Sequence, residues 1–214
     1  MNAPDLSAFN PATIAVFVTL AILSVLALTV TLFKLIQFSR MGVGKHKNAE
    51  TIVDHWLNGR PDEAMRVAAT RQTVLARVLE AVFSALRARP NDNDYAEELG
   101  RQTALVELAS MSRRMRLLEA VVQAAPMLGL LGTVIGMIDA FGVLAATQGA
   151  ADPAMLAGGI WTALMTTAVG LAIALLTFFA ANWLESRIDG ERQAIETLVS
   201  VVIYGRVGAA AAGK

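Results

Sequence analysis

The 214-residue chain contains no cysteine, only two histidines, and eighteen basic against eighteen acidic side chains. The absence of cysteine excludes a disulfide scaffold, a thiol nucleophile and a cysteine-ligated metal. The two histidines, His46 and His55, lie in a charged region rather than in a histidine-rich cluster. Balanced charge gives no indication of a nucleic-acid partner. We therefore expect no metal site, no cofactor and no enzymatic activity.

Charge is also missing from three long stretches, at residues 6–33, 120–138 and 153–184. Roughly 20 apolar residues suffice for a helix to cross a bilayer core. Asn10-Pro11 lies near the beginning of the first stretch and Asp152-Pro153 at the beginning of the third, and both are typical of helix starts. A buried helix of a soluble protein could resemble any one stretch, but three leave too little polar sequence to cover them. We predict an all-α integral membrane protein with three spans.

The positions of the cations predict the orientation. Residues 1–33 and 139–186 contain no lysine or arginine, so all eighteen basic residues fall on one side of a three-span topology. The positive-inside rule assigns that side to the cytoplasm. The predicted order is an outward N-terminus (1–12), a first span (13–33) that stays as an anchor, a cytoplasmic helical region (34–116), a second span (117–146), an outward loop (147–153), a third span (154–184), and a cytoplasmic helix and tail (185–214).

The cytoplasmic regions also have helical patterns. Asp94 and Glu97 have the spacing of a capping box, and no proline or other strong breaker follows before Pro126. One helix is therefore predicted from about Asp94 to Ala146, and the third span is predicted to continue to about Tyr204. The mixed charges around Arg60, Arg66, Arg71 and Arg77 indicate a solvated face, with phospholipid headgroups or another protein as the alternative contact.

Small residues recur on one face of the second span. Gly129, Gly132 and Gly136 lie three and four residues apart, and Gly170 lies in the third span. Small residues let helix backbones approach closely in lipid, where helix association has no hydrophobic driving force. These glycines are predicted to be helix-packing positions.

Hydroxyl side chains accompany the glycines: Thr133 in the second span, and Thr162, Thr166 and Thr167 in the third. They could bond back to carbonyls of their own helices. Alternatively, they could form a polar stripe that faces protein or water. From Ala120 onward, Asp139 is the only charged residue of these two spans, and it is either a solvated acid near a helix end or a group at the outer mouth of an ion path.

Two segments carry a resemblance to a known family. The runs Ala-Pro-Met-Leu-Gly-Leu-Leu-Gly-Thr-Val-Ile-Gly-Met at 125–137 and Thr-Thr-Ala-Val-Gly-Leu-Ala at 166–172 resemble signature segments of the MotA/TolQ/ExbB proton channel family. The resemblance covers nearly the whole chain. Three spans fit the ExbB/TolQ branch rather than the four-span MotA branch, and the ExbB group is the most similar.

The resemblance implies a ring-shaped homo-oligomer, a pentamer, in the bacterial inner membrane. Its second and third spans would line a pore around single-span ExbD or TolR helices, each carrying a membrane aspartate. Proton flow would drive work on TonB, for uptake of iron-siderophores and vitamins, or on TolA, for outer-membrane integrity. Thr133 and Thr167 match the pore threonines of the family. Thr162 stands where several members have glutamate, so the titrating acid would come from another chain. A non-conducting membrane scaffold is the remaining alternative.

Overall fold

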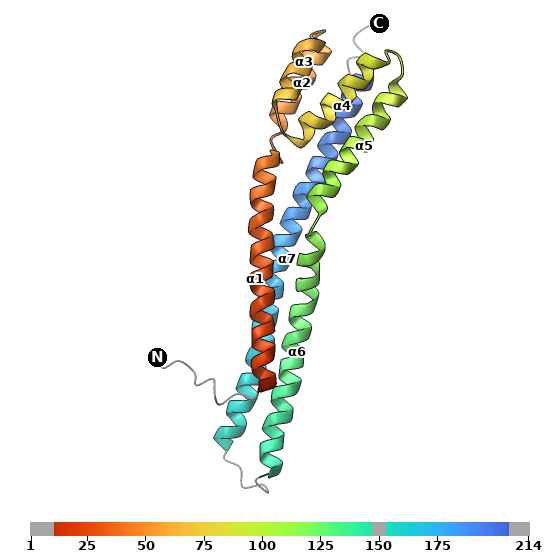
Figure 1. Ribbon diagram of the computed structural model, residues 1–214. Helices are drawn as coiled ribbons and strands as arrows, with labels where there is room; N and C mark the ends of the chain where they lie inside the picture. Colours follow the sequence, from red (N-terminus) through yellow and green to blue (C-terminus); the bar gives the residue numbers. More distant parts are fainter. Residues whose placement is uncertain (1–10, 147–152, 206–214) are drawn as a thin grey trace. The chain divides into compact units, whose positions relative to one another are not determined.

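Seven α-helices form the regular structure of residues 11–146 and 153–205, the ranges that the computed structural model describes (Figure 1). They are α1 (Pro11–Met41), α2 (His46–Leu57), α3 (Pro61–Thr70), α4 (Val74–Ala88), α5 (Asn93–Ser112), α6 (Met115–Ala146) and α7 (Pro153–Tyr204). The all-helical prediction is confirmed over these residues. Most of the predicted outward N-terminus, nearly all of the outward loop and the C-terminal tail lie outside them.

Three helical stretches are long and apolar enough to cross a membrane. They are Pro11–Leu57, Asn93–Ala145 and Leu156–Tyr204, and their most apolar windows have mean hydropathies of 2.6, 2.0 and 2.1. Most side chains in these windows are not buried inside the chain. Such surfaces need lipid or other protein around them.

The chain divides into two compact units. The first contains the described residues of 1–32 and 114–182, and the second contains those of 33–113 and 183–214. Helices α1 and α7 contribute residues to both units. In the first unit, Val16 and Leu20 of α1 form a small core with Ala125 of α6 and Ala174 of α7. This core is thin, and large apolar side chains such as Met127, Trp161 and Leu176 remain exposed.

The second unit has a core typical of a water-soluble helical domain. Helix α4 is N-capped by Thr73, whose hydroxyl accepts a hydrogen bond from the Ala76 amide, and the helix buries eight side chains. One of them, Phe83, stacks on Trp56 of α2 with ring centroids 4.3 Å apart. Burial of aliphatic and aromatic surface from water stabilises this unit.

The single helix predicted from Asp94 to Ala146 is divided in two. Helix α5 ends at Ser112 and α6 begins at Met115, with Arg114 in the left-handed region at a φ of 72°. This conformation is costly for a residue other than glycine. Two carbonyl groups at the end of α5 accept hydrogen bonds from side chains of α1. The Lys34 ammonium donates to the Met111 carbonyl, and the Gln37 amide donates to the Ser110 carbonyl. A buried cation at a helix C-terminus is favourable, so tertiary contacts end α5 without a local breaker.

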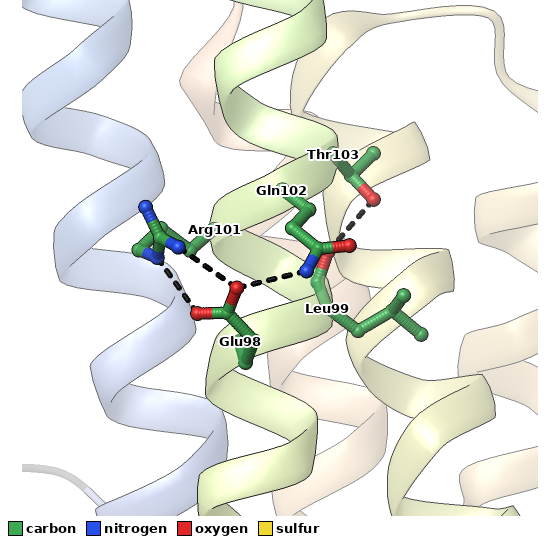
Figure 2. Close-up of polar contacts among 5 residues, drawn as sticks. All are labelled: Glu98, Leu99, Arg101, Gln102 and Thr103. Carbon is green, nitrogen blue, oxygen red and sulfur yellow. Dashed lines mark hydrogen bonds and ion pairs between the residues drawn. The ribbon is translucent and has the colours of Figure 1, made fainter.

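The start of α5 also differs from the prediction. The N-cap is Asp92, whose carboxylate accepts from the Tyr95 amide at 3.0 Å, rather than Asp94. Further along α5, Figure 2 shows the Glu98 carboxylate receiving hydrogen bonds from Arg101 and Gln102, all of 2.8 Å. The bonds from Arg101 and then Gln102 lower the pKa of Glu98 to about 2. The cluster is exposed and therefore contributes little to stability.

Candidate functional site in the second and third spans

The contact between α6 and α7 in the first unit is made by small residues. A Cβ added to Gly132 would lie 2.6 Å from the Cβ of Thr166, and one added to Gly136 would lie 2.7 Å from that of Ala163. A Cβ on Gly170 would lie 2.5 Å from the Ala125 carbonyl oxygen. The two backbones are therefore too close for any larger side chain at these positions.

A single backbone carbonyl, that of Gly129, lies within reach of two threonine hydroxyls. The Thr167 hydroxyl donates to it at 2.9 Å. The Thr166 oxygen lies 3.1 Å from the same carbonyl oxygen and 2.6 Å from that of Ala163, and its one proton can serve either acceptor. The close approach at Gly129 makes this interhelical bonding possible, because a Cβ there would lie 2.9 Å from the Cα of Thr167.

The other two predicted threonines bond within their own helices. The Thr133 hydroxyl donates to the Leu130 carbonyl at 2.7 Å, and the Thr162 hydroxyl donates to that of Gly158 at 3.0 Å. Both side chains are half-buried, as is Thr167, whereas Thr166 is fully buried between the helices. Within one chain, Thr133, Thr162 and Thr167 therefore remain able to contact something outside it.

The surface of α6 around Thr133 is mostly apolar. A shallow depression of about 650 Å³ is lined by Thr133, Val134, Met137, Ile138, Phe141 and Gly142. Asp139 lies on the same helix and is half-buried. The next residue, Ala140, faces α7, because a Cβ added to Gly159 would lie 2.9 Å from the Cβ of Ala140. The predicted role of Asp139 at a pore mouth stays a prediction.

The chemistry available here is that of hydroxyls and carbonyls. A threonine that donates to a carbonyl keeps lone pairs that can accept a hydrogen bond from water or from a protonated acid. A hydroxyl does not itself ionise near neutral pH. These four threonines can therefore bind and orient water or a donor from another chain, but they do not supply a titrating group.

The sequence analysis missed two features. One is that the small-residue contact extends to Gly159 and Ala163. Small residues are common throughout this part of the chain, so their sequence alone does not mark these two as contact positions. The other lies in the second unit, where Glu191 of α7 is fully buried. Glu191 occupies a position in a buried stripe with Leu184, Ile188, Ile195 and Val199. A carboxylate on an apolar helical face was the available signal, since such a group requires a partner.

Comparison with known proteins agrees with this architecture. Residues 70–197, more than half of the chain, match the model of the MotA/TolQ/ExbB proton channel family. An ExbB homolog of Methanothermobacter thermautotrophicus is 33% identical over 67% of the chain and 49% of its own length. An ExbB-like protein of Synechocystis is 31% identical over 78% of the chain and 65% of its own length. The TolQ protein of Haemophilus influenzae is 37% identical over 41% of the chain and 38% of its own length.

The chain thus covers about half of the length of the first relative and about two thirds of the length of the second. The matched region includes both glycine-rich and threonine-rich segments of the contact described above. With three stretches apolar enough to cross a membrane, the chain is a multi-pass membrane protein that belongs to the MotA/TolQ/ExbB proton channel family.

Proposed function

We propose that this chain is the channel and stator subunit of a proton-driven motor of the bacterial inner membrane, in the manner of ExbB. Five copies would form a ring, with α6 and α7 toward a central pore. The observation that carries the proposal is the α6–α7 contact, in which the Thr167 hydroxyl and the Gly129 carbonyl meet inside the segment matched by the family model.

The pore threonines in this proposal are Thr133 and Thr167, with Thr162 at a third position. Each side chain is only half-buried within one chain and keeps a hydroxyl oxygen able to accept a hydrogen bond. Because none of them titrates, the moving proton would be carried by a membrane aspartate of an ExbD-like or TolR-like partner. Moving one charge through the membrane potential releases about 2.3 kcal/mol per 100 mV, which can shift a conformational equilibrium.

The test replaces hydroxyls by methyl groups of the same shape. Thr133→Val/Thr167→Val is expected to abolish proton flux, measured in vesicles that contain the ring and its aspartate-bearing partner. The control is Thr29→Val, which removes a hydroxyl that donates to the Val25 carbonyl within α1. The ring should still assemble in both variants, and its assembly is monitored by measuring the mass of the purified complex. Undiminished flux in the double variant would overturn the proposed path.

A TolQ-like role is supported by the relative from Haemophilus influenzae. The two roles differ in the output protein, TonB-like or TolA-like. Pull-down of the intact ring with each candidate output protein from the same organism separates them. A pure scaffold is favoured by one observation, namely that all four hydroxyls already bond to carbonyls of the same chain. The flux measurement decides between a scaffold and a channel.

A further inference from the structure

Ion pairs are distributed unevenly over the second unit. Six of its basic side chains pair with a carboxylate: Arg60, Arg77, Arg87, Arg89, Arg101 and Arg192. The next three basic residues after the buried Lys34, namely Arg40, Lys45 and Lys47, are exposed, and none of them forms an ion pair with a residue in 11–146 or 153–205. Arg66, Arg71 and Arg113 also have no carboxylate partner within these ranges.

The turn that carries Lys45 is held in one conformation. Gly42 and Gly44 have φ angles of 68° and 82°, which favour glycine, and a Cβ on Gly42 would lie 3.3 Å from the Cβ of Thr73. The Gly44 amide donates to the buried Glu191 carboxylate at 3.1 Å, and His46 Nε2 donates to the same oxygen at 3.1 Å. This anchoring leaves the neighbouring Lys45 and Lys47 side chains at the surface.

A fourth cation reaches this turn from α7. The Arg187 guanidinium nitrogen Nη1 lies 3.1 Å from the place that a Cβ on Gly44 would occupy. The same guanidinium lies over the Trp183 ring, 5.1 Å from its centroid. Tryptophan is enriched at membrane–water interfaces, where its ring lies at the level of the headgroups. Arg187 therefore contacts Trp183, a residue type common at the level of the lipid headgroups, and also lies beside the Gly44 turn.

Exposed apolar side chains near the end of α1 come shortly before Arg40, Lys45 and Lys47 in the chain. Phe33, Leu35 and Ile36 are 46%, 40% and 57% exposed, and all three belong to the second unit. At 1.5 Å per residue, Arg40 lies roughly 6 Å further along the helix than Ile36. An apolar surface followed by cations without carboxylate partners matches the change from acyl chains to charged headgroups.

We propose that Arg40, Lys45, Lys47 and Arg187, here called the span-end patch, form a binding site for the headgroups of anionic phospholipids, with phosphatidylglycerol as the test ligand. The buried Glu191 carboxylate positions the patch by fixing the turn, and the lipid phosphates pair with four cations that form no ion pair with the described residues. The proposal requires that the chain lies in a membrane, but it does not depend on proton conduction.

The experiment compares two lipids and two variants of the full-length protein. Detergent-solubilised protein is titrated with phosphatidylglycerol or phosphatidylcholine, and bound lipid is counted by native mass spectrometry. Lys45→Gln/Lys47→Gln should weaken phosphatidylglycerol binding by about five- to twentyfold at low salt and leave phosphatidylcholine binding unchanged. Arg60→Gln/Arg66→Gln removes the same charge elsewhere in the unit and should change neither affinity by more than about twofold.

Three outcomes would overturn the proposal. They are equal affinity of the native protein for both lipids, an equal loss of phosphatidylglycerol binding in both double variants, and binding that salt does not weaken. Salt matters because the Debye length shrinks from about 10 Å at 0.1 M to about 3 Å at 1 M. If Lys45→Gln/Lys47→Gln lowers thermal stability, the salt series on the native protein and the charge-preserving Lys45→Arg/Lys47→Arg variant decide, and the latter should bind as the native protein does.

Discussion

The two units are stabilised by opposite kinds of side chain. In the first unit, α6 and α7 meet through glycine, alanine and threonine, and hydroxyl-to-carbonyl bonds link the helices. In the second unit, the contacts are made by large aliphatic and aromatic side chains, among them Phe83, Leu79 and Ile52, under a charged surface. The difference follows from the solvent. Water drives burial of large apolar groups, whereas lipid does not, so close backbone approach and dispersion must hold membrane helices together.

The largest effect is expected when a bulky side chain is placed in the small-residue contact between α6 and α7. Gly132→Leu should destabilise the α6–α7 pair by about 3 kcal/mol, because its first carbon already overlaps Thr166 and the facing backbone cannot move independently. Loss of stability would be measured as a lower thermal midpoint of the purified protein in detergent and as loss of a disulfide engineered between the two helices.

The matched control is Gly142→Leu, also on α6, where a Cβ meets no atom within 4 Å. It should leave the thermal midpoint unchanged or raise it slightly, because glycine is a poorer helix former than leucine. Equal destabilisation by both variants would show that α6 tolerates no larger residue anywhere, and that the contact with α7 is not the cause.

A second test concerns a place where the second unit departs from its own pattern. Glu191 is a fully buried carboxylate in an otherwise apolar stripe, and it accepts from the Gly44 amide and from His46. Glu191→Ala should cost about 1–3 kcal/mol, since both donors lose their acceptor. It should also speed amide hydrogen exchange at residues 42–46. Glu196→Ala, an exposed position on the same helix, serves as the control and should change neither quantity.

These residues also show which parts of the structure were predictable from sequence. Long uncharged runs and a Gly132-x-x-x-Gly136 spacing are local patterns, and they predicted the spans and the face of α6 that meets α7. The end of α5 was not predictable, because no local breaker stands at 113–114 and the carbonyls are satisfied by Lys34 and Gln37, more than seventy residues earlier. Likewise, Thr166 and Thr167 have the same sequence signal, and only the three-dimensional contact makes one fully buried and the other half-buried.

The smallest expected effect lies at the exposed end of α7, where polar contacts contribute little because water competes for them. The Tyr204 hydroxyl donates to the Glu97 carboxylate at 2.8 Å, and this bond raises the pKa of Tyr204 above its ordinary value of 10.0. Since the folded pKa is the higher one, the contact contributes fully below the pKa of the unfolded phenol and is lost as pH rises through the folded pKa.

Tyr204 can be observed alone, because the chain has only two tyrosines. In a Tyr95→Phe background, phenolate absorbance should appear at higher pH than for a free tyrosine, and Glu97→Gln should return the titration to the ordinary range. Glu97→Gln should leave the thermal midpoint at neutral pH nearly unchanged, in contrast to Gly132→Leu. A large drop in that midpoint would mean that exposed polar contacts stabilise the second unit as much as its apolar core does, and the comparison between the two units would then fail at its simplest point.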